Sequence, residues 1–251
     1  MEQNIAFSYE NIGKDIQVCI SADHRFGTDA FLLADFAGAR HKDNVLDLCA
    51  GNGIVGLLVW RNFAPAALTG IEIQPQAFEQ MRRGAAASGL DGFTPVLGDL
   101  RSFHAEKAFD LVTCNPPYKA DGMGRQNPAQ AQAVARHELL CTLDDVCVSA
   151  ARNLRFGGRL CLCNRPERLC DIMVSMRAHG IEPKRIRFVA KDTASAPWLV
   201  LAEGRKGGGA FLKVEPTLIV GGAAAGTYSE EMKRVYGIET AGTLVRRCAT
   251  E

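Results

Sequence analysis

The sequence reads VLDLCAGNGIVG from Val45 to Gly56, so a short apolar run leads directly into a glycine-rich turn. Glycine adopts positive φ readily, and its lack of a Cβ lets the backbone approach a ligand closely. The apolar run predicts a buried strand, and the residues after Gly53 predict the start of a helix. This stretch therefore predicts the first strand, turn and helix of an open α/β fold.

Apolar runs of similar length recur along the chain. They predict core strands at 44–48, 68–73, 94–97, 109–114 and 159–163. Helical segments separate these strands, and such alternation is typical of a parallel, doubly wound sheet. One helix is marked by Thr142-Leu-Asp-Asp145, which resembles a capping box.

The glycine-rich turn also predicts a nucleoside cofactor. Residues 51–56 fit the pattern GxGxxG, and Glu72 lies about 20 residues further on, at the spacing of a ribose-binding acid. The pattern alone does not separate a dinucleotide from another nucleoside. Asp47, just before the turn, suits a cofactor with an amino-acid tail and no pyrophosphate. Asp99, which follows the strand at 94–97, could accept a hydrogen bond from an adenine amino group.

A second motif, Asn115-Pro116-Pro117-Tyr118, directly follows the apolar run Phe109–Cys114. The two prolines end the predicted strand abruptly. Ligands of open α/β sheets bind at the carboxyl ends of the strands, so an amide and an aromatic ring are expected at the site of chemistry. The alternative is a turn that merely closes a strand, with Tyr118 packed nearby.

In this order, the glycine turn, Glu72, Asp99 and the Asn-Pro-Pro-Tyr motif resemble the class I S-adenosylmethionine (SAM) dependent methyltransferases of exocyclic or amide nitrogens. The resemblance implies a Rossmann-like α/β domain with a seven-stranded, mostly parallel sheet and helices on both faces. It implies that strands at 185–190 and 198–202 end that sheet as an antiparallel pair. Cys49 stands where the first loop glycine of these enzymes usually lies; because cysteine is small, we expect SAM binding to be retained.

The resemblance also assigns site residues. The expected cofactor-binding residues are Thr28, Asp47, Cys49, Gly51, Gly53, Glu72, Ile73, Asp99, Leu100 and Asn115. The expected catalytic residues are Asn115, Pro116, Pro117 and Tyr118, and the expected substrate-binding residues are Tyr118, Arg136 and His137. Thr28 could equally cap the helix that follows it. Arg136 and His137 could equally be ordinary surface residues.

Four segments resemble the compact bacterial tRNA adenine-N6 methyltransferases that modify adenosine 37 of a valine tRNA. These segments are Phe26–Leu33, Cys114–Tyr118, Ala135–Glu138 and Leu212–Ile219. The resemblance implies that the substrate is an unpaired adenine in tRNA. The alternatives are methylation of a protein glutamine, as in release-factor methyltransferases, or of another RNA base. A further alternative is an inactive, SAM-binding RNA chaperone.

Composition bounds the remaining expectations. The 251 residues, of which 47% are hydrophobic, suit one domain, with an extension at 1–43, a core at 44–204 and a tail at 205–251. Nine scattered cysteines without metal-ligand spacing predict reduced core residues and no metal. No apolar run is long enough for a membrane helix, and the N-terminus does not read as a signal peptide. We expect a cytoplasmic monomer or weak dimer.

Charge gives a weaker indication of a nucleic-acid partner. The net charge is only +1, but ten basic residues lie between Arg152 and Lys191. Such a run could contact RNA phosphates or could form an ordinary solvated face.

Overall fold

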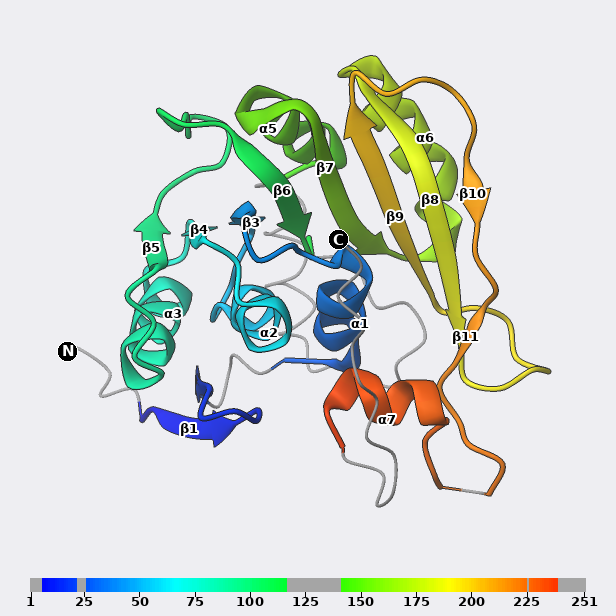
Figure 1. The fold of residues 1–251 in the computed structure, drawn as a ribbon, viewed down its shortest axis with the longest axis horizontal. Helices are drawn as coiled ribbons and strands as arrows, with labels where there is room; N and C mark the ends of the chain where they lie inside the picture. Colours follow the sequence, from blue (N-terminus) through cyan, green and yellow to red (C-terminus); the bar gives the residue numbers. More distant parts are fainter. Residues whose placement is uncertain (1–5, 22–25, 117–140, 225, 239–251) are drawn as a thin grey trace, which may run out of the picture.

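The structure is a computed structural model that describes residues 6–21, 26–116, 141–224 and 226–238. A central twisted sheet occupies the middle of the molecule (Figure 1). Its main strands are β3 (Asn44–Leu48), β4 (Ala67–Glu72), β5 (Phe93–Leu97), β6 (Phe109–Cys114), β7 (Leu154–Asn164), β8 (Ile181–Ala190) and β9 (Leu199–Lys206).

The seven main strands lie in the order β5-β4-β3-β6-β7-β9-β8. The first five are parallel, and β9 is antiparallel to both of its neighbours. The expected seven-stranded, mostly parallel sheet with a final antiparallel pair is therefore confirmed. Two short strands, β10 (Lys213–Val214) and β11 (Leu218–Ile219), extend its edge by pairing parallel to β8.

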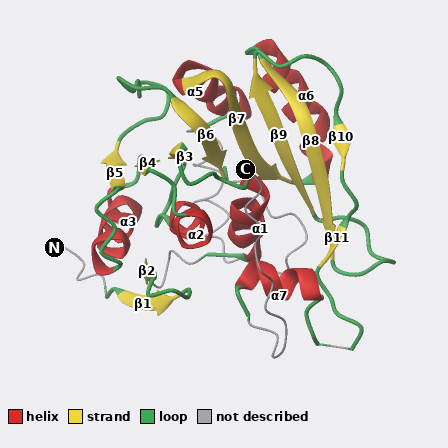
Figure 2. Cartoon of the chain, in the orientation of Figure 1, coloured by secondary structure: helices red, strands yellow, loops and turns green. Residues whose placement is uncertain are grey.

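Helices cover both faces of the sheet (Figure 2). They are α1 (Thr28–Ala37), α2 (Ile54–Phe63), α3 (Pro75–Ala87), α5 (Leu143–Asn153), α6 (Leu169–Ala178) and α7 (Glu230–Tyr236), with a 3-10 turn η1 (Pro166–Arg168) before α6. One core cluster includes residues of α1, α2, α3 and α7, whereas α5 and α6 belong to the other. The expected helices on both faces are thus confirmed.

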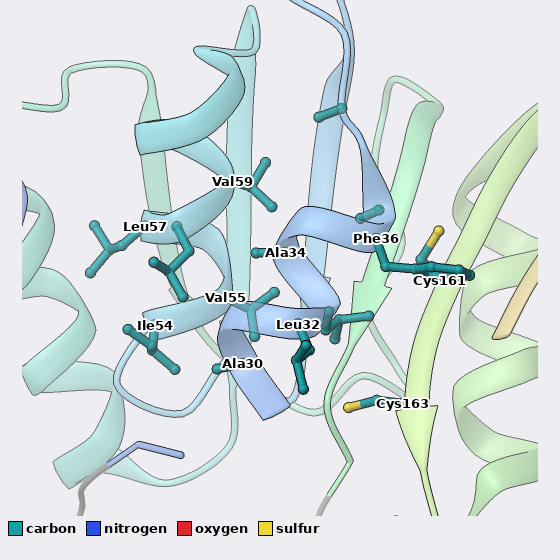
Figure 3. Packing of buried hydrophobic residues seen from close by; sticks show 14 of the residues in the cluster. Ala30, Leu32, Ala34, Phe36, Ile54, Val55, Leu57, Val59, Cys161 and Cys163 are labelled. Carbon is teal, nitrogen blue, oxygen red and sulfur yellow. The ribbon is translucent and has the colours of Figure 1, made fainter. Parts of the chain in front are cut away.

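Alternation along β7 links the two clusters. Leu160 and Leu162 belong to the cluster on the α5 and α6 side. Cys161 and Cys163 belong to the other cluster, and Figure 3 shows the Cys163 side chain pointing from β7 toward α1. Successive residues of a strand point to opposite faces, so one strand supplies both cores. Both cysteines are buried and free, as expected for reduced core residues.

The predicted capping box begins α5. The Thr142 hydroxyl accepts from the Asp145 amide at 3.1 Å, and the Asp145 carboxylate accepts from the Thr142 amide at 2.9 Å. Each side chain thereby satisfies a backbone donor that the first helical turn leaves unpaired. This fixed start directs α5 back along β6 and β7.

The chain ends of the described region pack on the same face. At the N-terminus, β1 (Ser8–Asn11) and β2 (Gln17–Ile20) form an antiparallel ribbon, and β2 packs beside α3. Near the C-terminus, the ring of Tyr236 in α7 packs edge-on against Phe31 in α1, with centroids 4.9 Å apart. These contacts support our proposal that the extension, core and tail form one domain.

Candidate functional site

The carboxyl ends of β3, β4, β5 and β6 meet at one edge of the sheet. Residues at and just after these strand ends surround a cavity of about 200 Å³. The lining residues are Cys49, Gly51, Ile71, Glu72, Ile73, Gln74, Gly98, Asp99, Leu100, Asn115 and Cys141. Seven of the ten predicted cofactor residues therefore share one cavity: Cys49, Gly51, Glu72, Ile73, Asp99, Leu100 and Asn115.

The glycine turn forms one wall of this cavity. Gly51 has φ +58°, and a Cβ built on it would meet no atom within 4 Å, so a side chain there would extend into open space. Gly53 has φ +83° at the start of α2, and its Cβ would come within 2.8 Å of Met81. Gly53 thus lets α3 pack closely behind the turn, whereas Gly51 keeps the cavity open.

Glu72 connects the turn to the end of β4. Its carboxylate accepts from the Gly51 amide at 2.8 Å and from the Gln74 amide at 2.9 Å, with only 4% of the residue exposed. One side chain therefore fixes two loops that line the cavity. A carboxylate has about four lone-pair sites, so Glu72 can also accept from the hydroxyls of a ligand.

Asp47 lies behind the turn and is not among the residues that line the cavity. It is 1% exposed, and its carboxylate accepts from the Thr113 hydroxyl at 2.7 Å and the Gly56 amide at 3.2 Å. Removal from water raises the pKa of Asp47 to about 7. In this arrangement Asp47 supports the turn from below.

Asp99 and Leu100 line the cavity beyond β5. The Asp99 carboxylate accepts from the Arg101 guanidinium at 2.9 Å and from the Arg101 amide at 2.9 Å. These hydrogen bonds lower the pKa of Asp99 and keep it ionised as an acceptor. An adenine amino group at Asp99 would share the carboxylate with Arg101.

Thr28 is likewise absent from the cavity lining. Its hydroxyl lies 2.7 Å from the Tyr236 hydroxyl, which connects the first residue of α1 to α7. Gly27 rather than Thr28 is the residue before the helix, and it makes no side-chain cap. The prediction that Thr28 contacts the cofactor stays a prediction.

Asn115 directly follows β6 and lines the same cavity as the glycine turn. Its amide nitrogen donates to the Asp29 carboxylate at 2.9 Å, and its amide oxygen accepts from the Cys163 thiol at 3.0 Å. Pro116 is buried directly after it. The other predicted site residues, Pro117, Tyr118, Arg136 and His137, lie outside the described residues.

Four lining residues were not predicted from the sequence. Ile71, Gln74 and Gly98 are direct neighbours of predicted residues in the sequence. Their positions at the strand ends are therefore a sufficient signal to predict them. Cys141 has no such signal: it stands 92 positions after Cys49, yet the two sulfur atoms lie 3.7 Å apart. Only the folded chain brings these two cysteines together.

Arginines of the basic run are largely engaged in ion pairs. Arg159 and Arg185 both donate to Glu203, at 3.1 and 2.8 Å. Arg187 forms a two-point pair with Glu231, with both distances at 2.8 Å. These three arginines therefore stabilise the packing of β7, β8, β9 and α7, which is a structural role rather than a free basic surface.

Two absences hold for the described part of the chain. None of its helices combines the length and apolarity needed to cross a membrane. Nor do its His, Cys, Asp and Glu side chains form a group of three or more that could hold a metal ion.

Comparison with known proteins agrees with this geometry. The methyltransferase small domain family model matches residues 21–167. A Porphyromonas gingivalis protein named tRNA1(Val) (adenine(37)-N6)-methyltransferase is 31% identical over 241 residues, covering 91% of this chain and 92% of the relative. A protein of the same name from Aeromonas hydrophila is 28% identical and covers 92% of this chain and 94% of the relative.

A solved structure shares the fold. A predicted O-methyltransferase from Agrobacterium tumefaciens superposes with a TM-score of 0.67 at 20% identity, over 83% of this chain and 95% of that one. The similarity along most of the chain and the match over 21–167 show that the protein belongs to the methyltransferase small domain family.

Proposed function

We propose that this methyltransferase transfers the methyl group of SAM to the exocyclic N6 of an unpaired adenine in tRNA, at adenosine 37 of valine tRNA. The observation that carries the proposal is the position of Asn115, which faces the same cavity as Glu72 and the glycine turn. Relatives that match along more than 90% of the chain and bear the name of this activity support the choice of substrate.

The cavity fits the proposed cofactor. The fixed Glu72 carboxylate would accept from ribose hydroxyls, and the open space beside Gly51 leaves room for a ligand against the backbone. Asp99 and Leu100 would contact the adenine ring. When bound, SAM supplies an electrophilic methyl group on a sulfonium centre.

Asn115 and Pro116 then act on the nucleophile. An exocyclic amine of adenine is planar and almost non-basic because its lone pair is delocalised into the ring. The Asn115 amide oxygen and the Pro116 carbonyl would accept hydrogen bonds from the two N–H groups of this amine and draw its nitrogen toward tetrahedral geometry. The amine becomes acidic as it is methylated, so this chain need supply no strong base before attack.

The base must reach the cavity unstacked. A target inside a duplex would have to be flipped out at a cost of a few kcal/mol, which favours a loop adenine. Tyr118 would stack on it, an interaction worth roughly 1–3 kcal/mol per base in nucleic-acid proteins. Arg136 and His137 would contact the RNA backbone. We further propose a cytoplasmic location and a monomer or weak dimer.

The test is methyl transfer from labelled SAM to separate pools of unmodified tRNA, ribosomal RNA and release factor, followed by mass spectrometry of the products. We expect N6-methyladenosine in tRNA. Label only in release factor would replace tRNA by a protein glutamine as substrate. SAM binding without transfer to any pool would indicate the inactive chaperone.

The same assay tests Asn115 directly. Asn115→Ala is expected to lose turnover while binding SAM as the wild type does, measured by calorimetry. Asn11→Ala, at an exposed asparagine in β1, is the matched control and should retain both. Turnover that survives in Asn115→Ala would contradict the proposed chemistry.

A further inference from the structure

The Asn115 amide is held from two sides by residues of different elements. Asp29, in the first turn of α1, accepts from Asn115 Nδ2 at 2.9 Å. Cys163, near the end of β7, donates from Sγ to Asn115 Oδ1 at 3.0 Å. In Figure 3 the Cys163 side chain points from β7 toward the first turn of α1.

We propose that Asp29 and Cys163 are positioning residues, which fix the orientation of the Asn115 amide so that its oxygen faces the amine to be methylated. This inference rests on the proposed function because it requires that the methylated nitrogen carries an N–H bond that Asn115 can hold. It does not depend on whether this nitrogen belongs to an adenine or to a glutamine amide.

The Asp29 contact selects one orientation because a carboxylate can bond only to the donor end of the amide. An ionised carboxylate has no donor, so it requires Nδ2 on the Asp29 side. A flipped amide would place Oδ1 against that carboxylate and lose this hydrogen bond in a part-buried site, where an unpaired polar atom is costly. Asp29 alone therefore disfavours the flipped orientation.

The Cys163 contact agrees with this orientation from the other side. Burial raises the pKa of the Cys163 thiol, as does the neighbouring charge of Asp29, so the thiol keeps its proton and acts as a donor. In the structure the thiol donates to Oδ1. An amide oxygen has two lone pairs, so Cys163 leaves one for a substrate N–H.

The Asp29 contact also strengthens Asn115 as an acceptor. A hydrogen bond from Nδ2 to a charged carboxylate is charge-assisted, and it shifts electron density along the conjugated amide toward Oδ1. The oxygen is thereby better able to hold an amine whose nitrogen becomes positive in the transition state. Positioning and polarisation act in the same direction.

The test uses a swapped pair. In Asn115→Asp, two carboxylates would lie where the amide and Asp29 are 2.9 Å apart, and their repulsion should displace residue 115. Asp29→Asn should then restore a single hydrogen bond with donor and acceptor exchanged. The measured quantities are kcat and KM for whichever acceptor the wild type methylates, and the Kd for SAM.

We expect Asp29→Ala and Asn115→Asp each to lower kcat roughly 10- to 100-fold, because small misplacements at a reacting centre have effects of this size. The double variant should recover at least about tenfold over Asn115→Asp, since the two changes share one interaction. Cys163→Ala should lower kcat by less, because Asp29 still fixes the amide, and Cys163→Ser should restore it. The Kd for SAM should stay nearly constant throughout.

Asp35→Asn is the control on the same helix, because Asp35 pairs with Arg234 at 2.9 Å and does not contact Asn115. It should behave as the wild type. A merely structural Asp29 predicts instead that the double variant is no better than Asn115→Asp; that result would overturn the proposal.

A readout without substrate separates this inference from the proposed function. The Asn115 side-chain NH₂ should give a 15N-labelled NMR signal that exchanges slowly with water and becomes fast in Asp29→Ala. Slow exchange in both proteins would refute the hydrogen-bond role. Methylation of release factor alone would refute the tRNA assignment but not this role, whereas absence of transfer to any acceptor would overturn both.

Discussion

The Asp47 carboxylate accepts a hydrogen bond of 2.7 Å from the Thr113 hydroxyl, which joins the neighbouring strands β3 and β6 beneath the glycine turn. Its other oxygen accepts from the Gly56 amide in α2 at 3.2 Å. Burial nevertheless outweighs these hydrogen bonds and raises the pKa of Asp47 to about 7. The group that supports the turn is therefore sensitive to pH.

The raised pKa of Asp47 predicts a stability that falls as the pH rises. Between about pH 4, the pKa of an unfolded Asp, and pH 7, the folded chain binds the Asp47 proton more tightly than the unfolded chain does. Raising the pH through this window should cost up to about 4 kcal/mol relative to Asp47→Asn, at roughly 1.4 kcal/mol per unit of pKa difference. Urea unfolding of the wild type and of Asp47→Asn at several pH values measures this loss. A difference in the free energy of unfolding that stays constant with pH would contradict the raised pKa.

Glu72 carries a second prediction, because it accepts from both Gly51 and Gln74. Glu72→Ala leaves these two amides without their partner and should lower the free energy of unfolding by about 1–3 kcal/mol. It should also weaken SAM binding strongly, since the ribose acceptor is lost. Thermal unfolding with and without SAM separates the two effects. Glu106→Gln, at an exposed position before β6, is the control and should change neither the free energy of unfolding nor SAM binding. A Glu72→Ala protein that SAM stabilises as fully as the wild type would refute the ribose role.

The parts of the site that the sequence predicts share one physical basis. Glu72 ends an apolar strand and Asp99 and Asn115 each follow one, and parallel strands bring their carboxyl ends to one edge. Local spacing is then enough to predict that the three residues meet. The helix start at Thr142 is predictable for the same reason, because its partner Asp145 lies only three positions away.

Other contacts have no local signal. Asp29 and Cys163 reach Asn115 from 86 and 48 positions away, and only the packing of α1 on β7 brings them together. The basic run reads as a surface in the sequence, yet Arg159 and Arg185 converge on Glu203 across neighbouring strands. Predicting such contacts requires the register of the strands, which alternation alone does not give.

Cys49 gives a third prediction, because its φ of +54° lies in the left-handed region that favours glycine. Cys49→Gly removes the strain of a side chain in the left-handed region but raises the conformational entropy of the unfolded chain. The two effects oppose each other, so the free energy of unfolding should change by no more than about 1 kcal/mol. SAM binding should be retained. Cys49→Val places a β-branched residue at positive φ and should destabilise the protein by about 1–3 kcal/mol. Calorimetry and urea unfolding measure both; many-fold tighter SAM binding in Cys49→Gly would show that the cysteine compromises the site.

Arg61 connects the C-terminal helix to the core. It is 7% exposed and donates to the carbonyl oxygens of Ile12 at 2.7 Å, Val235 at 3.0 Å and Tyr236 at 3.3 Å. Arg61→Met keeps much of the side-chain volume but leaves these three acceptors without their donor. Because each of the three lost hydrogen bonds to a charged group costs about 1.5–3 kcal/mol, we expect a total loss of about 4 kcal/mol or more.

The loss should be concentrated in α7. Hydrogen exchange of amides in Glu230–Tyr236 should become faster in Arg61→Met, while exchange in the strands β3 and β6 should change little below the unfolding transition. Arg82→Met is the matched control, because Arg82 pairs with Glu79 on the surface, where ion pairs contribute little. If α7 exchanged equally slowly in both variants, its attachment would depend on the packing of Tyr236 against Phe31 rather than on Arg61.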